Sequence, residues 1–319
     1  MSHHIVEFRD VYFQYPDGTE PLSGLSFRIT HGESVGIVGA NGAGKSTLLL
    51  HMNGCLLPLK GTIDIGDHQV TKETRREIRK KVGMIFQNPD DQLFMPTVFD
   101  DVAFGPLNLG LAPDRVRERV ETSLERVGSL ALMHKPPHHL SGGQKSAVAI
   151  ASVIAMQPDI LVMDEPASSL DPRARRYLIN LLNDFEHTKI IASHDLDLIL
   201  DVCERCIVIK NGKVMADGPS EKILSDRALL EDNHLELPLS LQGRTNNRKR
   251  GGTMNEIDKL NHLLGHWLEH NREHAATYGE WGNKAASAGK PELAAILKEI
   301  AQKTSAMDVL FQRAAEACK

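Results

Sequence analysis

Short apolar runs alternate with longer stretches of helical spacing along the first part of the chain. The runs at 34–38, 159–163 and 189–192 are rich in aliphatic residues, and a turn and a helical stretch follow each of them. Strands buried on both faces of a parallel sheet have this nearly continuous apolar character. The pattern therefore predicts an α/β fold with buried parallel strands.

Three segments depart from this alternation. The segments 5–15 and 25–30, IVEFRDVYFQY and LSFRIT, have the β-rich character of an antiparallel edge. Asn211-Gly212 marks a hairpin within 205–218. Between Phe94 and Leu140 helical stretches such as DRVRERVETSLERVG replace the strand-like runs. We therefore expect an antiparallel edge and a helical subdomain inserted into the sheet.

The character of the chain changes after residue 236. The segment 237–252, LPLSLQGRTNNRKRGG, contains proline, glycine, asparagine and charge without periodicity, which predicts a linker. Thr253 and Glu256 fit a capping box, the pattern that begins many helices. We therefore expect a large α/β domain at 1–236, a linker at 237–252 and a small domain at 253–319.

The segment 253–319 has the pattern of a helical hairpin. On the first helix, apolar positions recur at Leu260, Leu264, Trp267, Tyr278 and Ala285, and Pro291 stands where a second helix can begin. A hairpin of about 65 residues is small enough that a partner could be required for its stability. The apolar positions of the second helix are Leu293, Ile296, Ile300, Met307 and Leu310.

Composition and charge exclude several classes of protein. With 41% hydrophobic residues and a net charge of -5, the chain is an ordinary globular protein without the basic surface that nucleic acids require. It contains no uncharged apolar run of about 18 residues, so any membrane-spanning part must come from other subunits. Four cysteines and the lack of a signal peptide after Met1 favour a reducing cytosol.

A glycine-rich loop follows the first buried strand. The residues Gly39–Ser46, GANGAGKS, fit the pattern GxxxxGK[ST] directly after SVGIV. Glycines allow backbone N–H groups to surround a phosphate, and the following helix adds positive potential at its N-terminus. Lys45 can then reach the terminal phosphates, and the Ser46 hydroxyl can ligate Mg²⁺.

Two further motifs are expected to bind phosphate groups or to take part in their hydrolysis. The strand DILVMDEP ends in Asp164 and Glu165, whose side chains must point to opposite faces of the strand. One carboxylate is expected to hold Mg²⁺ while the other orients or deprotonates water. The residues Leu140–Gln144, LSGGQ, precede a helical stretch and offer a second helix N-terminus to a phosphate.

The order of these motifs from residue 5 to residue 236 resembles the ATP-binding cassette (ABC) ATPases. The resemblance implies a P-loop NTPase fold with a RecA-like core, an antiparallel β edge and an inserted helical subdomain, followed here by the all-α hairpin. LSGGQK in place of the commoner LSGGQR is conservative. The matching elements are Gly39–Thr47 as Walker A, Gln87 as Q-loop, LSGGQ at 140–144, Asp164 and Glu165 in Walker B, Ser169–Asp171 as D-loop and His194 as switch histidine.

The resemblance also implies a role for individual residues. It gives Ser46, Gln87 and Asp164 to Mg²⁺, general-base catalysis to Glu165 and contact with the γ-phosphate to His194. Tyr15 looks like the aromatic residue that stacks on adenine, and a core tyrosine is the alternative. ATP lies between Walker A of one subunit and LSGGQ of another, so the active species is a dimer. The full nucleotide-binding set is Tyr15, Gly39, Asn41, Gly42, Ala43, Gly44, Lys45, Ser46, Thr47, Gln87, Ser141, Gly143 and Asp171.

The sequence around Gln87 indicates the class of ABC protein. FQNPDDQ at 86–92 resembles the energy-coupling-factor type, which includes cobalt, nickel and vitamin importers, and KSAVAIASVIAM resembles its cobalt/nickel branch. We expect a second, identical ATPase subunit, an integral membrane coupling subunit and a substrate-binding membrane subunit at the cytoplasmic face of the membrane. A vitamin importer with a structural tail, or a soluble ABC regulator with a partner-binding tail, remains an alternative.

Four histidines recur at every fourth position of the first hairpin helix. Such neighbours have Cβ atoms about 5–6 Å apart, so a pair can share one ion, and imidazole suits Ni and Co. All four cannot share one ion, because twelve residues rise about 18 Å along a helix. A solvated helix without metal is equally compatible with the pattern, and so is binding of Ni²⁺ or Co²⁺ by His262, His266, His270 and His274.

Overall fold

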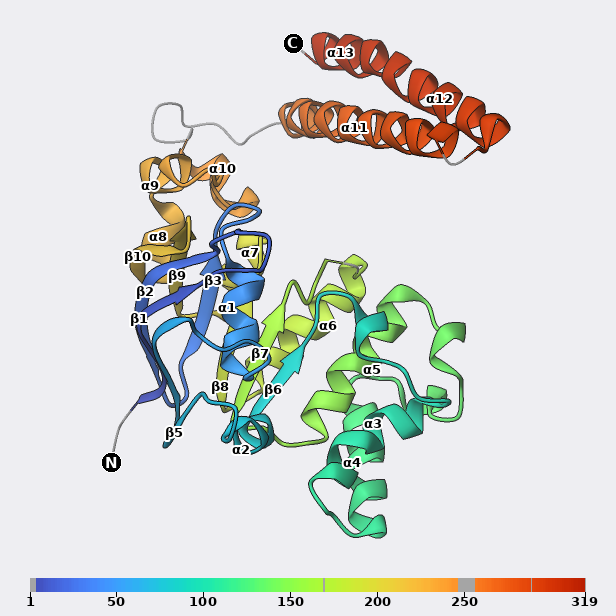
Figure 1. Ribbon diagram of the computed structural model, residues 1–319. Coiled ribbons are helices and arrows are strands. Elements are labelled where there is room, and N and C mark those ends of the chain that lie inside the picture. Colours follow the sequence, from blue (N-terminus) through green and yellow to red (C-terminus); the bar gives the residue numbers. More distant parts are fainter. Residues whose placement is uncertain (1–3, 169, 246–255, 288, 319) are drawn as a thin grey trace. The chain divides into compact units, whose positions relative to one another are not determined.

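The computed structural model describes residues 4–168, 170–245, 256–287 and 289–318 (Figure 1). The chain divides into two compact units, 1–242 and 243–319, and each is described separately. None of the helices in the described part of the chain combines the length and apolarity needed to cross a membrane.

A six-stranded sheet forms the centre of the first unit, with strand order β10-β9-β3-β8-β7-β6. All neighbouring strands are parallel except β10, which runs antiparallel to β9 across the turn at Asn211 and Gly212. Every residue of β3, β7 and β8 is buried, as the apolar runs predicted. The strands are β3 (Ser34–Val38), β6 (Val82–Ile85), β7 (Ile160–Asp164), β8 (Thr188–Ala192), β9 (Arg205–Lys210) and β10 (Lys213–Pro219).

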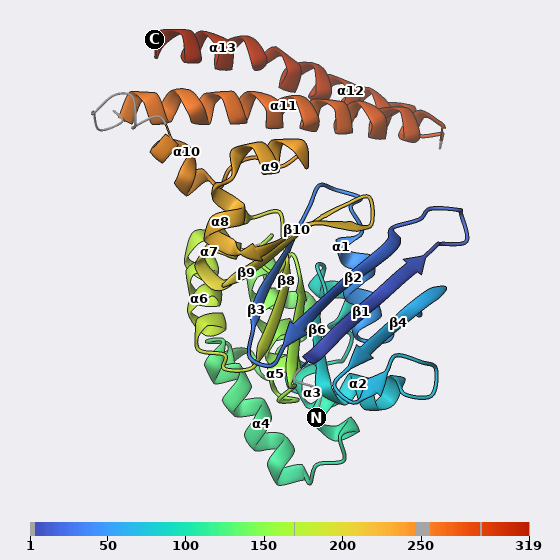
Figure 2. The ribbon, with the colours of Figure 1, turned by 90° about the vertical axis from the view of Figure 1, so that its left-hand side faces the viewer.

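A second sheet of four antiparallel strands confirms the predicted antiparallel edge. Its strand order is β2-β1-β4-β5, and Figure 2 shows β2, β1 and β4 side by side as one layer. Helix α1 (Lys45–Met52) buries Leu48, Leu49 and Met52 in a core that both sheets share. The strands are β1 (His4–Phe13), β2 (Leu22–Thr30), β4 (Lys60–Ile65) and β5 (His68–Gln69), and the short helix α2 (Arg75–Lys81) precedes β6.

The segment between β6 and β7 is the predicted helical subdomain (Figure 1, lower right). Val102, Val120 and Val148, from its three α-helices, are fully buried in one apolar core. That core continues into the central sheet, so the subdomain is attached to the sheet by apolar packing. Its elements are η1 (Pro89–Asp91), α3 (Val98–Asn108), α4 (Pro113–Arg126), η2 (Leu130–Leu132), η3 (Pro137–His139) and α5 (Gly142–Ile154).

The first part of the expected linker is helical instead. Helix α10 (Leu239–Thr245) begins where the backbone N–H groups of Leu239 and Ser240 donate to the Asp197 carboxylate, at 2.9 and 3.1 Å. This cap lies in a distant helix, so no local pattern in 237–245 indicates it. The rest of the expected linker, 246–252, lies outside the described residues. The preceding helices are α6 (Pro172–Asn183), α7 (Leu196–Val202), α8 (Ser220–Ser225) and α9 (Arg227–Asp232).

The second unit is an antiparallel helical hairpin. Helix α11 (Glu256–Ser287) packs against α12 (Pro291–Ala306) and α13 (Asp308–Ala317), so the expected second helix is divided at Met307. Thr253 of the expected capping box lies outside the described residues. The predicted apolar positions of the second helix lie on the surface of this unit rather than in its interior.

Candidate functional site

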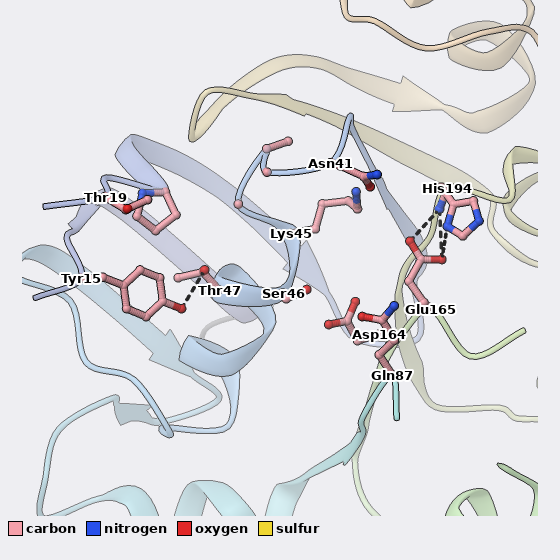
Figure 3. Close-up of a pocket in the computed structure, with 14 residues that line it drawn as sticks. Tyr15, Thr19, Asn41, Lys45, Ser46, Thr47, Gln87, Asp164, Glu165 and His194 are labelled. Atoms are coloured by element: carbon pink, nitrogen blue, oxygen red, sulfur yellow. Dashed lines mark hydrogen bonds and ion pairs between the residues drawn. The ribbon is translucent and has the colours of Figure 1, made fainter. Parts of the chain in front are cut away.

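A cavity of about 560 Å³ opens above the glycine-rich loop (Figure 3). It brings together the loop, the first strand's end, the Gln87 segment and the ends of β7 and β8. Sequence reasoning missed Thr19 and Pro21, which have no motif of their own. The lining residues are Tyr15, Thr19, Pro21, Asn41, Gly42, Ala43, Gly44, Lys45, Ser46, Thr47, Gln87, Asp164, Glu165 and His194.

The loop can take its shape only with glycine at particular positions. Gly44 has a φ of 102°, and a Cβ there would lie 2.3 Å from the carbonyl oxygen of Pro21. A Cβ on Gly39 would lie 2.3 Å from the carbonyl oxygen of Ile209. The loop therefore packs against the chain on both sides. Apart from the Ala43 N–H, which donates to the Ala40 carbonyl at 3.1 Å, its N–H groups can face the cavity.

Lys45 is buried at the start of α1, beside the loop. Its Nζ donates to the carbonyl oxygens of Gly39 and Ala40, at 2.7 and 3.3 Å. Burial lowers the pKa of this ammonium, and the charges of Glu165 and Asp164 act in the opposite direction. Loop carbonyls and two carboxylates therefore hold a cation where phosphate oxygens would enter the cavity.

Asp164 is the feature of the cavity that best fits a divalent cation. It ends β7 and is buried, and among the described residues its Oδ1 has no hydrogen-bond partner. Burial raises the pKa of Asp164, while a hydrogen bond from Ser46 lowers it. Figure 3 shows Gln87 next to this carboxylate. Carboxylate, hydroxyl and amide oxygens are ligands that Mg²⁺ prefers, so these three side chains fit the ion.

Glu165 has quite different surroundings from its neighbour. Its backbone is left-handed, with a φ of 48°. Its Oε2 accepts from the Ser193 hydroxyl at 3.0 Å and lies 2.8 Å from Nδ1 of His194. Its Oε1 accepts from the His194 backbone N–H at 3.0 Å. The carboxylate is therefore held against the end of β8, and Ser193 is a further residue that sequence reasoning missed.

Tyr15 forms an aromatic wall of the cavity. Its hydroxyl shares a hydrogen bond of 3.1 Å with the Thr47 hydroxyl, and its ring meets Phe13 edge to face at 5.0 Å between centroids. Phe13 in turn contacts the buried ring of His51 at 4.8 Å. The tyrosine is therefore fixed at both ends, and its ring borders a space that a flat heterocycle can enter.

Three predicted nucleotide contacts lie away from this cavity. Ser141 is the N-cap of α5 and forms a capping box with Gln144. A Cβ on the neighbouring Gly142 would meet none of the described atoms within 4 Å, so the start of this helix is open. Gly143 lies in its first turn, and Asp171 caps α6 through the N–H groups of Arg173 and Ala174. Within the described part of one chain, the start of α5 therefore does not lie at the cavity above the glycine-rich loop.

The four histidines of the hairpin lie on α11, but their side chains are outside the described part of the structure. Within the described residues, no group of three or more histidine, cysteine, aspartate or glutamate side chains could hold a metal ion. The expectation of nickel or cobalt at His262, His266, His270 and His274 therefore has no support from the described geometry.

Comparisons with known proteins agree with this geometry. A family model described as ABC transporter matches residues 22–168. A Geobacter sulfurreducens protein, provisionally named an ABC transporter ATP-binding protein, is 62% identical over 76% of this chain and 98% of its own length. The chain belongs to the ABC transporter ATP-binding proteins. It is therefore an ATPase subunit of a transporter, and ATPases of this family bind ATP with Mg²⁺.

Two further proteins that are similar to this chain have names that specify a type of transporter. "Energy-coupling factor transporter ATP-binding protein EcfA" of Methanocaldococcus jannaschii is 48% identical over 74% of this chain and 86% of its own. The solved structure of cbiO1 from Clostridium perfringens, described as part of the ABC transporter complex cbiONQ, has a TM-score of 0.65 and 36% identity, covering 76% of this chain and 99% of that one.

The fold and the tail have matches of their own. A dimeric structure of the cassette MJ0796 bound to ADP and Pi has a TM-score of 0.62 and 26% identity, covering 67% of this chain and 98% of that one. These likenesses confirm the P-loop ABC ATPase fold. Residues 260–318 match a domain of unknown function, DUF8180.

Proposed function

We propose that this ABC ATPase is the energy-coupling subunit of an importer for nickel or cobalt ions, bound to membrane subunits at the cytoplasmic face of the membrane. The observation that carries its ATPase chemistry is the cavity in which the loop, Lys45 and the unpartnered Asp164 oxygen converge. The name of the M. jannaschii relative and the description of cbiO1 support the importer class.

Each residue of the cavity has its own role in phosphoryl transfer in this proposal. The N–H groups of Asn41–Thr47 bind the phosphates, and Lys45 neutralises charge on the terminal one. Ser46, Gln87 and Asp164 would hold Mg²⁺, and the ion would lower the cost of negative charge on the phosphates. Glu165 takes the proton of the attacking water, and His194 contacts the γ-phosphate. Tyr15 stacks on the adenine.

Both oxygens of Glu165 accept hydrogen bonds from the end of β8. Its Oε2 is engaged by Ser193 and by Nδ1 of His194, whose side chain is largely exposed at the cavity. We infer that His194 turns towards the γ-phosphate when ATP binds and so frees one carboxylate oxygen. That movement would expose this oxygen to the attacking water.

A second chain completes each site in this proposal. Ser141, Gly143 and Asp171 lie at helix starts away from the cavity of their own chain, where they can face the nucleotide of another. The dimeric MJ0796 cassette supports such an arrangement. A helix N-terminus opposite the loop adds N–H donors and positive potential to the phosphates.

The segment after Gln87 supports contact with a membrane subunit. Gln92 ties this segment to α5, because its amide donates to Ala149 and Ser152 at 2.8 and 2.9 Å. A few residues further on, Phe94 and Phe104 meet edge to face while 64% and 44% exposed. A membrane subunit that packs on these two rings would therefore be linked to both Gln87 and the LSGG helix.

Uptake by cells that naturally carry this chain tests the importer proposal. Replacing the chain by its Glu165→Gln variant should abolish energy-dependent uptake of radiolabelled nickel or cobalt and leave vitamin uptake unchanged. Loss of vitamin uptake instead would support the vitamin-importer alternative. Unchanged uptake of both would support a soluble regulator.

The tail histidines give a separate test of metal specificity. Both tryptophans of the chain, Trp267 and Trp281, lie in the hairpin, so their emission reports on it in the full-length protein. If His262, His266, His270 and His274 bind metal in pairs, micromolar Ni²⁺ or Co²⁺ should quench this emission stoichiometrically. An identical response from the variant with all four histidines replaced by alanine would contradict metal binding by the tail.

A further inference from the structure

The hairpin exposes a row of large apolar side chains that we name the apolar face. Each of its seven members is between 40% and 60% exposed. Among the described side chains of this unit, the buried apolar ones are Leu264 and three alanines. Most of the large apolar side chains that the structure describes in this unit are therefore exposed or only partly buried. The apolar face consists of Trp267, Trp281, Leu293, Ile296, Ile300, Met307 and Leu310.

Small and polar residues form the contact between the helices of the hairpin. A Cβ on Gly282 would lie 3.1 Å from Cγ of Lys298 and 3.5 Å from the carbonyl oxygen of Ala294, so α11 and α12 approach closely there. Asn271 donates to the Thr304 carbonyl and to Asp308, at 2.6 and 2.7 Å. At these two positions the contact is therefore made by small and polar groups together with the stem of Lys298.

The members of the apolar face lie on one side of the hairpin. Trp281 directly precedes the contact residue Gly282, and Leu293 directly precedes the contact residue Ala294. One residue turns a helix by about 100°. In an antiparallel pair, the positions one step before the contact residues on both helices point to the same side of the pair. The other members of the apolar face likewise each precede a residue that is at least partly buried.

We propose that the apolar face packs against the apolar face of a second copy of this chain, so that two hairpins form a four-helix bundle. Seven side chains that are each about half exposed present on the order of 600 Å² of surface, which approaches the ~800 Å² per partner of a standard interface. A two-fold axis lets one patch complement itself. The bundle would bury the large side chains that each hairpin leaves exposed.

The charges near the face allow this pairing. Lys303, the charged residue between Ile300 and Met307, is paired with Glu299 at 2.8 Å. Lys284 lies over the Trp281 ring at 4.6 Å, a contact in which the ring itself attracts the ammonium. The related cassette MJ0796 has been solved as a dimer, and a dimer carries two tails in one assembly. The pairing of tails goes beyond the proposed import function and does not depend on it.

The full-length chain without nucleotide, in EDTA, tests this inference by sedimentation and tryptophan emission over a dilution series. We expect a dimer at micromolar concentration whose emission moves to longer wavelength as dilution exposes Trp267 and Trp281. The variant with Ile296→Asp and Ile300→Asp should stay monomeric with long-wavelength emission throughout. The matched control, Ala295→Asp with Gln302→Asp, carries the same charges on exposed positions away from the face and should behave as wild type.

Three results would overturn the proposal. If the chain is a monomer and its emission stays at short wavelength at every concentration, another part of the same chain covers the apolar face. A monomer with long-wavelength emission at every concentration means that the face awaits another molecule. A dimer that survives the aspartate pair places the interface elsewhere. Far-UV circular dichroism checks that the variants keep their helices, and the wild-type dilution series decides the question even where they do not.

Discussion

At the scale of single residues, the site contains a buried carboxylate whose negative charge destabilises the folded state. Asp164 is buried next to Glu165 and has an oxygen without a described partner, and burial raises its pKa. A raised pKa means that folding disfavours the carboxylate above the pKa of the unfolded chain. The fold therefore carries this acid at a cost that binding of Mg²⁺ can offset.

Asp164→Asn should stabilise the protein when nucleotide and metal are absent. Removing the buried charge should add on the order of 1 kcal/mol at pH 8 and raise the thermal midpoint by roughly 2–4 °C. The gain should shrink as the pH falls through the raised pKa, because the native acid is then neutral. Thermal unfolding in EDTA at pH 8 and pH 5 measures it. Asp159→Asn, an exposed site just before the same strand, is the control, and an equal change there would contradict the explanation.

The loop glycines should differ in what they contribute to folding. Gly42 and Gly44 both have positive φ, but only the Cβ of Gly44 would collide with a described atom. Gly42→Ala should cost about 1–2 kcal/mol of unfolding free energy from its backbone alone. Gly44→Ala should cost more, because the Pro21 carbonyl must also move. Urea unfolding without nucleotide compares the two, and equal costs would show that the loop is not pressed against Pro21.

At the scale of elements, local patterns predicted the buried strands, the β edge and the helical insertion. These elements can be recognised from the local sequence because their own residues are continuously apolar or have helical spacing. Helix α10 could not be predicted in this way, since its cap is Asp197 in α7. Pro21 and Ser193 were missed for the same reason, because each contacts a distant segment. Thr19 lines the cavity but belongs to no motif.

Asp197→Ala should loosen α10 without changing the ATPase core. Loss of both N-terminal acceptors should cost about 1 kcal/mol locally. Hydrogen exchange at the amides of Leu239 and Ser240 should speed up by roughly tenfold or less, in line with that free energy. Glu186→Ala, at an exposed site, is the control. Unchanged exchange in the Asp197 variant would mean that packing of Leu237 alone holds this segment.

At the scale of the whole molecule, the sequence motifs predicted the residues of the cavity better than those of the tail. The cavity residues share one ligand, so their types and spacing follow from phosphate chemistry. The hairpin pattern predicted two helices, but not that Ile296 and Ile300 would stay exposed. Helical spacing shows that residues share a face, and it does not show what covers that face.

The central claim is that this cavity hydrolyses ATP with Glu165 as the base, and the rate of ATP hydrolysis by the Glu165→Gln variant tests it most directly. Glutamine keeps the size of the side chain but cannot accept the proton of water, so the rate should fall by about 10²-fold or more while a fluorescent ATP analogue still binds. The exposed Glu186→Gln control should keep the wild-type rate. Hydrolysis by Glu165→Gln at a rate within about twofold of wild type would contradict the account.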